Sequence, residues 1–204
     1  MISYIAFEGI EGAGKSTVMA AVEEVLHDRG VPVTTVREPG ATRVGEQIRE
    51  ILLDLGSTID PWAEAMLFAA ARAHLVRDIV QPALDRGEIV LSDRSVFSSL
   101  AYQGGGRDLG IEQVRMVNAA ALGGIWPDRV ILLRVDPTTG IDRQEVVDRI
   151  GAEGIEFQAR VANAFDTLVA ADPERFAVID ASEPIASVVQ AAIKEVERWL
   201  WTPS

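Results

Sequence analysis

The amino-acid sequence predicts an α/β domain built on a five-stranded parallel sheet that is wrapped by helices. Short apolar runs suited to buried strands alternate with longer helical stretches along the chain. Such alternation is typical of a parallel sheet with helices on both faces. With 204 residues, of which 48% are hydrophobic, the chain is expected to form a single domain over residues 1–204 with one sizeable core.

The candidate strands are five apolar runs: Ile2–Phe7, Val33–Val36, Ile89–Leu91, Val130–Val135 and Phe176–Ile179. The helical stretches between and after them include Ser16–Gly30, Pro61–Leu84, Ile111–Leu122 and Ile185–Leu200. Ligands of such sheets bind beyond the carboxyl ends of the strands. The residues directly after each strand are therefore the first candidates for a functional site.

A glycine-rich loop follows the first strand. Gly9, four further residues, and then Gly14, Lys15 and Ser16 match the pattern of a phosphate-binding loop. The glycines let successive backbone N–H groups form a concave nest, the lysine supplies a compact charge, and the serine hydroxyl can bind a nucleotide's magnesium. We expect this lysine to be solvated in the free protein. The alternative is a plain glycine-rich turn between a strand and a helix.

Charged residues follow the second and third strands. Arg37 comes after the second, and Asp93 and Arg94 come after the third. Asp93 is expected near the magnesium of the loop, where a water-mediated metal ligand is usual, and Arg94 could clamp a phosphate with two hydrogen bonds. The alternative is a simple Asp93–Arg94 ion pair at a strand end.

The helix over Pro61–Leu84 carries Phe68 and Arg72 on one face, because the two residues are four apart. An aromatic ring and a guanidinium placed this way can stack on a nucleobase and hydrogen-bond to its edge. Taken alone, an aromatic residue at this spacing is more often part of the core.

Composition excludes several classes of protein. The formal net charge is −12, which disfavours a nucleic-acid-binding surface. The chain has no cysteine, so disulfides and thiolate metal sites are excluded. No run approaches the ~20 apolar residues of a membrane span, and the first residues lack the pattern of a signal peptide. We expect a cytoplasmic protein without nucleic-acid or membrane partners.

Taken together, the motifs resemble those of thymidylate kinases, a family of nucleoside monophosphate kinases. They occur in the family's order over essentially the whole chain: "FEGIEGAGKST", "REPG", "FAAAR", "SDRSVFSSLAYQGGGR", "WPDRVILLRVDP" and "DRI". The resemblance implies a three-layer P-loop NTPase fold with a short lid, approximately residues 140–154. It also implies transfer of the γ-phosphoryl group from ATP to dTMP, with ATP and Mg²⁺ as cofactors.

The resemblance also implies roles for particular residues. ATP would be bound by Gly9, Ile10, Glu11, Gly12, Ala13, Gly14, Lys15, Ser16, Thr17 and Arg143. The acceptor nucleotide would be bound by Glu11, Arg37, Pro39, Phe68, Arg72, Arg94, Ser99, Tyr102 and Gln103. Ser16 and Asp93 would hold the metal. The catalytic residues would be Lys15, Asp93, Arg94 and Arg149.

Two departures from the family pattern stand out. Ala41 replaces a glycine after "REPG", which puts a positive-φ turn there in doubt. The lid is short, with Arg143 and Arg149 as its only arginines. Six residues is not a whole number of helical turns, so the two cannot point the same way on one straight helix. We expect Arg149 to be the main catalytic cation, the alternative being a surface ion pair with Asp148, Glu145 or Glu153.

The sequence leaves two alternative functions open. One is a P-loop kinase for another nucleotide or nucleoside, in which only the acceptor pocket would differ. The other is a catalytically weak nucleotide-binding relative, since lid closure completes such active sites and the lid is short. Relatives are commonly homodimers, and we expect the same here, since the apolar helix faces within Pro61–Leu84 and Ile111–Leu122 would allow it.

Overall fold

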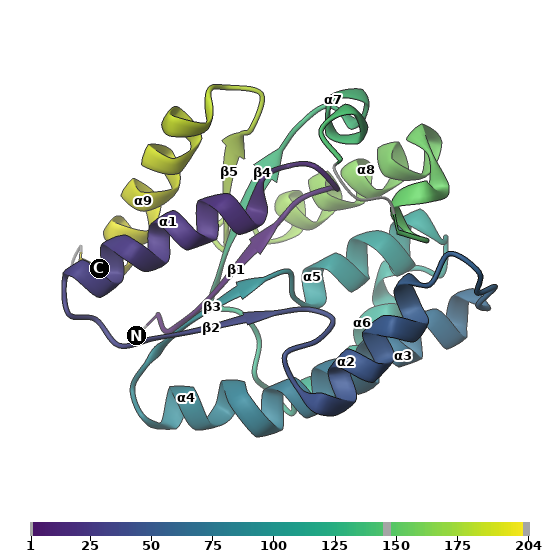
Figure 1. Cartoon of the computed structure of the whole chain (residues 1–204), viewed down its shortest axis with the longest axis horizontal. Coiled ribbons are helices and arrows are strands. Elements are labelled where there is room, and N and C mark those ends of the chain that lie inside the picture. The colour runs from purple at the N-terminus through teal and green to yellow at the C-terminus, as the bar shows by residue number, and fades with distance from the viewer. Residues whose placement is uncertain (1, 145–147, 202–204) are drawn as a thin grey trace.

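A five-stranded, fully parallel sheet lies at the centre of the computed structural model, which describes residues 2–144 and 148–201 (Figure 1). The strand order is β2-β3-β1-β4-β5. The strands are β1 (Tyr4–Glu8), β2 (Val33–Arg37), β3 (Ile89–Asp93), β4 (Arg129–Arg134) and β5 (Phe176–Asp180). The predicted number of strands and their parallel direction are confirmed. Four of the five strands continue one or two residues past the predicted carboxyl end, into the polar residues.

The central strand β1 is buried along its whole length, as its sequence YIAFE with four apolar residues requires. Its neighbours are β3 and β4, and Phe7 pairs in register with both Asp93 and Ile131. Because parallel strands end at the same edge of the sheet, this register brings the loops after β1 and β3 together.

Helices cover both faces of the sheet. On one face α1 (Lys15–Asp28) lies beside α9 (Ile185–Trp201), as the upper left of Figure 1 shows. The other helices gather on the opposite face and beyond the ends of the strands. They are α2 (Arg43–Leu53), α3 (Pro61–Leu75), α4 (Gln81–Asp85), α5 (Val96–Ser99), α6 (Ile111–Leu122), α7 (Pro137–Asp142) and α8 (Ile155–Ala171).

The helix predicted over Pro61–Leu84 consists of three consecutive segments. A π-helical stretch, Val76–Val80, separates α3 from α4. The change in hydrogen bonding lies next to Pro82, whose missing N–H group interrupts an α-helical ladder. A second π-helical stretch, Leu100–Gly106, follows α5. It carries Tyr102 and Gln103 of the predicted acceptor pocket.

The turn at Ala41 is retained although the residue is not glycine. Ala41 has φ of 63°, a conformation that non-glycine residues seldom adopt. Its N–H group donates to Glu46 Oε1 at 2.7 Å, and the same carboxylate accepts from Arg37 at 2.8 Å. Glu46, in the first turn of α2, therefore stabilises a backbone conformation that the alanine alone would disfavour.

The predicted lid, residues 140–154, begins at the end of α7 and ends with a 3₁₀ turn, Gly151–Glu153. Glu145 and its two successors lie outside the described residues. A Cβ added at Gly12 of the glycine-rich loop would lie 2.0 Å from the carbonyl oxygen of Gly140. The loop and the start of the lid therefore touch through backbone alone, and only glycine fits at residue 12.

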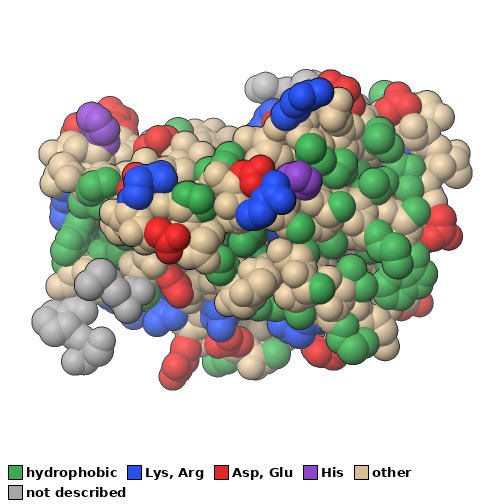
Figure 2. Space-filling view, turned by 90° about the horizontal axis from the view of Figure 1, so that it is seen from below, with side chains coloured by type: hydrophobic (Ala, Val, Ile, Leu, Met, Phe, Trp, Pro, Cys, Tyr) green, Lys and Arg blue, Asp and Glu red, His purple; other side chains and the backbone are tan. Residues whose placement is uncertain are grey.

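Several large hydrophobic side chains remain exposed on α2, α3 and α6 and just after the end of α2. Hydrophobic side chains, drawn in green, are visible at the right of Figure 2, the end of the molecule where α2 and α3 lie in Figure 1. The exposed residues are Val44, Ile51, Leu55, Trp62, Met66 and Met116. No helix within the described ranges is both long and apolar enough to cross a membrane.

Candidate active site

The glycine-rich loop connects β1 to α1. Gly9, Gly12 and Gly14 all have positive φ, of 145°, 72° and 88°. These values let the chain turn sharply at the end of the strand so that α1 begins at Lys15. The N–H groups of the first helical turn have no carbonyl partners within the helix and carry its positive dipole end. The loop and helix terminus together form a site suited to phosphate oxygens.

Lys15 is buried, contrary to the prediction of a solvated side chain. It is only 7% exposed, and its Nζ atom donates to the carbonyl oxygens of Ile10 at 2.9 Å and Gly9 at 3.2 Å. The loop wraps around the ammonium group, so backbone oxygens take the place of water. Burial, followed by the charge of Arg94, lowers the pKa of Lys15 to about 8.

Ser16 and Asp93 meet where the loop after β1 faces the end of β3. The Ser16 hydroxyl donates to Asp93 Oδ2. A hydroxyl and a carboxylate oxygen fit the hard-oxygen preference of Mg²⁺, which usually keeps several waters and substrate phosphate oxygens as its other ligands. Within the described ranges no group of three or more acidic, histidine or cysteine residues forms a cation cage. The donor set therefore suits a metal that arrives with a nucleotide.

Arg94 lies between the loop and the predicted acceptor pocket. Its guanidinium donates to Gly9 O at 3.2 Å and Ser98 Oγ at 3.1 Å, and it pairs with Glu11. It also lies 5.0 Å from the centre of the Tyr102 ring. Within the described ranges its ion pair is with Glu11, not with Asp93 as the alternative reading had it. Burial acts to raise the pKa of Glu11, but Arg94 and then Lys15 outweigh it and hold that pKa below its usual value.

Two cavities adjoin at these residues. The larger, of about 470 Å³, follows the glycine-rich loop. The smaller, of about 100 Å³, lies between α3 and the π-helical stretch after α5. Four charged side chains line both cavities: Glu11, Glu38, Arg49 and Arg94. The wall between the two cavities is therefore made of charged groups that two anionic ligands would share.

Comparison with known proteins agrees with this geometry. The family model for thymidylate kinase matches residues 7–192. The chain belongs to the thymidylate kinase family. It is 41% identical over 199 residues to the thymidylate kinase of Caldanaerobacter subterraneus subsp. tengcongensis, covering 97% of this chain and 96% of that protein. It is 44% identical over 201 residues to the thymidylate kinase of Bifidobacterium longum, covering 95% and 98%.

A solved structure is similar over almost the same extent. The thymidylate kinase of Ehrlichia chaffeensis superposes with a TM-score of 0.79 at 29% sequence identity, covering 96% of this chain and 98% of that one. The predicted family and the P-loop NTPase fold are confirmed.

Most acceptor residues predicted from the thymidylate kinase motifs line the smaller cavity. They are Glu11, Pro39, Phe68, Arg94, Ser99, Tyr102 and Gln103. Phe68 is partly buried and also packs against the core. Tyr102 makes edge-to-face contacts with Phe157 and Phe165, and its hydroxyl is buried without a partner within the described ranges. Arg37 lines the larger cavity instead.

Arg72 is placed differently from the expectation. It is 1% exposed and lines neither cavity. Its guanidinium pairs with Glu38 at 2.6 Å and donates to Ser99 Oγ at 3.1 Å and to Asn118. These bonds fix the positions of Glu38 and Ser99, which line the smaller cavity. The Nε atom of Arg72 is buried without a partner in the described part of the chain.

The two lid arginines point to different places, but neither lies within a helix, so the helical spacing considered for them is not the reason. Arg143 lines the larger cavity and donates to the carbonyl oxygen of Ala181 at 2.7 Å. Arg149 lines neither of the two cavities. It pairs with Glu64 at 2.7 Å and donates to the carbonyl oxygen of Leu52 at 2.8 Å. Among the described residues its carboxylate partner is therefore Glu64, which the sequence did not single out.

Other site residues also escaped the sequence-based reasoning. Glu38 belongs to the motif "REPG", and its charge and its position after a strand are the signals that mark it. Arg49 lies on α2 and has no motif to mark it. Glu8, fully buried at the end of β1, accepts from the Ser95 hydroxyl at 2.7 Å and the Ser98 hydroxyl at 2.6 Å. Its role is to fix the segment after Arg94.

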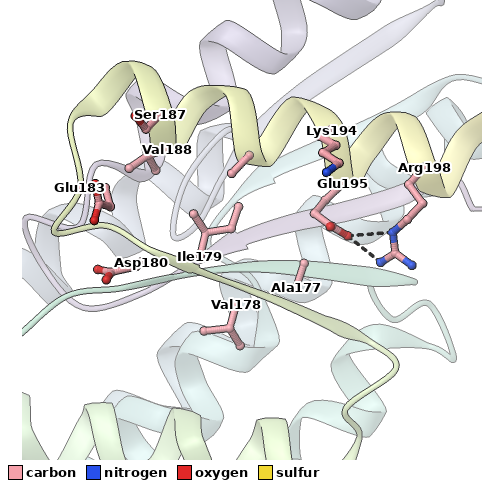
Figure 3. A pocket seen from close by; sticks show the side chains of 11 residues that line it. Ala177, Val178, Ile179, Asp180, Glu183, Ser187, Val188, Lys194, Glu195 and Arg198 are labelled. Carbon is pink, nitrogen blue, oxygen red and sulfur yellow. Dashed lines mark hydrogen bonds and ion pairs between the residues drawn. The ribbon is translucent and has the colours of Figure 1, made fainter.

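Cavity size alone does not locate the active site. A wider cavity, of about 680 Å³, lies between the edge strand β5 and α9 (Figure 3). No residue of the glycine-rich loop lines it, and Figure 3 shows Glu195 and Arg198 paired with each other at its far end. The predicted ATP and acceptor residues instead line the two smaller cavities with the shared charged wall.

Proposed function

We propose that this thymidylate kinase transfers the γ-phosphoryl group of ATP to dTMP across the wall that its two cavities share. The observation that carries the proposal is the pair Glu11 and Arg94, which lines both cavities. Phosphoryl transfer requires two anions to be held in line with their charge neutralised. Charged side chains that line both cavities can hold the two anions in this alignment.

ATP would occupy the larger cavity. The backbone N–H groups of residues 9–17 would bind its phosphates, and Arg143 would approach from the lid. Lys15 would turn from the carbonyl oxygens of Gly9 and Ile10 to the transferred group, which raises its pKa again because a phosphate favours the charged form. Ser16 and Asp93 would hold Mg²⁺, which neutralises charge on the nucleotide phosphates when bound.

The acceptor dTMP would occupy the smaller cavity. Phe68 would stack on thymine, while Gln103 and Ser99 would bind its polar edge. Tyr102 would lie against the sugar at the position of a 2′-hydroxyl and favour deoxyribose. Arg94, with Arg37, would hold the dTMP phosphate. Arg72 would act through Glu38 and Ser99, the residues that it holds.

The reaction then needs no strong general base. An oxygen of the dTMP phosphate attacks the γ-phosphorus of ATP, the bond to the β-phosphate oxygen breaks, and ADP leaves. Charge accumulates on the γ-phosphoryl oxygens in the transition state. Lys15, Arg94 and Arg143 supply positive charge there. Arg149 would add to it once it leaves Glu64 and the Leu52 carbonyl during lid closure.

We also propose that the chain works in the cytoplasm as a homodimer of single-domain subunits. The exposed hydrophobic side chains of α2, α3 and α6 (Figure 2) support the homodimer, because apolar patches of this kind mark interaction surfaces. The lack of cysteine suits a reducing compartment. Sedimentation velocity of the purified protein would test the dimer, and a monomer at micromolar concentration would contradict it.

A coupled kinase assay with ATP and Mg²⁺ tests the proposed function. The acceptors are dTMP, dUMP, CMP, UMP and GMP, and dTMP is expected to have the highest kcat/KM. A preference for another acceptor would identify a kinase for a different nucleotide. Binding of ATP and dTMP without transfer in a single-turnover experiment would identify a catalytically weak relative.

A further inference from the structure

Glu64 is a fully buried carboxylate beside the acceptor cavity. It lies in the first turn of α3 and has no exposed surface. Four hydrogen bonds end on its carboxylate. Arg107 donates twice, at 3.2 and 3.1 Å, Gln103 donates at 2.9 Å, and Arg149 donates at 2.7 Å. A buried carboxylate held by two arginines is ionised and can only accept hydrogen bonds.

This arrangement fixes the amide of Gln103. Because Glu64 can only accept, the NH₂ group of Gln103 must face it, and the amide oxygen must point the other way. Gln103 lines the smaller cavity. Among the hydrogen bonds of residues 2–144 and 148–201, none ends on Gln103 Oε1, and this atom is not among the buried atoms without a partner. Gln103 thus offers an acceptor, and not a donor, to a ligand in the cavity.

We propose that Glu64 is a positioning residue that sets base selectivity by holding Gln103 with its oxygen toward the acceptor base. This inference rests on the proposed placement of dTMP in the smaller cavity. Thymine and uracil carry a hydrogen on N3 and can donate it to this oxygen. Cytosine has a bare N3 lone pair, which would face the Gln103 oxygen without a proton between them.

The environment of Glu64 keeps this orientation stable. Burial acts to raise its pKa, but the hydrogen bonds from Arg107, Gln103 and Arg149 outweigh burial and hold the pKa below its usual value. Arg107 is itself held by Glu153 at 2.5 Å and lies over the Phe157 ring. The carboxylate therefore stays charged over the neutral pH range, and Gln103 cannot reverse its amide without placing its oxygen against it.

The variant Glu64→Gln tests this directly. Two arginine donors, one from Arg107 and one from Arg149, end on Oε2, whereas only Arg107 Nε ends on Oε1. The oxygen of the new amide would therefore take the Oε2 position, and its NH₂ group would face Gln103 while Arg107 Nε loses its partner. Gln103 could then accept from residue 64 and turn its own NH₂ group toward the base. We expect the ratio of kcat/KM for dTMP to that for dCMP to fall by roughly ten- to a hundredfold, the range of one unsatisfied buried hydrogen-bonding group.

Two controls separate positioning from folding. The ratio of dTMP to dUMP should not change, because both bases carry the N3 hydrogen. Glu153→Gln removes the other carboxylate partner of Arg107 without touching Gln103, and it should leave the dTMP to dCMP ratio as in the wild type. A merely structural role for Glu64 would instead lower kcat/KM for all acceptors by the same factor.

The outcomes are decisive in both directions. A folded Glu64→Gln variant with the wild-type dTMP to dCMP ratio would overturn the inference. Should that variant fail to fold, Glu64→Asp keeps the charge opposite Arg107 and Arg149 but draws it back from Gln103. It should lower the same ratio, and an unchanged ratio would again overturn the inference. A wild-type protein that does not phosphorylate dTMP would overturn the proposed function itself.

Discussion

Glu11 and Arg94 lie 83 residues apart in sequence and form an ion pair in the wall between the two cavities of the active site. One comes from the loop after β1 and the other from the end of β3. Arg94 adopts φ of 69°, which is rarely populated outside glycine. In the proposed reaction both nucleotides would lie against this pair.

Replacement of Lys15 by alanine should abolish turnover. Removing one preorganised hydrogen-bond donor from an active site costs on the order of 10²–10³-fold in kcat, and Lys15 would supply positive charge as well. Because Lys15 is buried and bound to Gly9 and Ile10, the melting temperature should also fall somewhat. The chain's other lysine provides the control, since Lys194→Ala on α9 should keep normal kcat. A Lys15→Ala variant that kept most of its activity would contradict the assignment of Lys15 to the transferred phosphoryl group.

The pKa of Lys15 predicts an alkaline limb in the activity profile. Its pKa is lowered to about 8 in the free protein, so the ammonium is present below that pH and is lost as the pH rises through it. We expect kcat/KM for ATP, which reports the free enzyme, to decline above pH of about 8. The limb for kcat should lie at higher pH, because bound phosphates favour the charged lysine. Identical limbs at pH 10 or above would contradict a buried, shifted lysine.

Phe68→Ala should weaken dTMP binding far more than ATP binding. The loss of a stack between an aromatic ring and a base is worth about 1–3 kcal/mol, roughly a ten- to hundredfold rise in Kd. Titration calorimetry of both nucleotides and a melting curve measure the two effects. Phe97, a core residue that does not line the acceptor cavity, is the control. Phe97→Ala should lower the melting temperature instead, and the same pattern in Phe68→Ala would assign Phe68 to the core.

Arg149→Ala is expected to change both rate and stability. If Arg149 reaches the transferring group when the lid closes, kcat should fall by ~10³-fold, as for arginines in related chemistry. Loss of its pair with the buried Glu64 should also lower the melting temperature. Arg143 lines the larger cavity and donates to the carbonyl oxygen of Ala181, so Arg143→Ala should weaken ATP binding with a smaller loss of kcat. If Arg149→Ala lowered the melting temperature but kept a normal kcat per folded molecule, Arg149 would hold the lid in place without assisting the reaction.

The sequence by itself determined the sheet, the glycine-rich loop and the acceptor motif. These features are local, because strand burial follows from short apolar runs and a phosphate-binding loop follows from residues that are contiguous in the chain. Ser16 and Asp93 could also be paired in advance, since the carboxyl ends of neighbouring parallel strands share one edge of the sheet. The positions of Phe68, Tyr102 and Gln103 on one cavity followed from the family resemblance.

Only the tertiary structure decided which charged side chains pair with one another. Arg149 is 85 residues from Glu64, and Arg72 is buried against Glu38 and not exposed to the acceptor cavity. Lys15 is enclosed by its own loop, although the same motif is compatible with a solvated side chain. A long arginine or lysine side chain can reach many partners of similar energy. The choice among them depends on packing across the whole chain, so local sequence could name the charged residues of this site but not their partners.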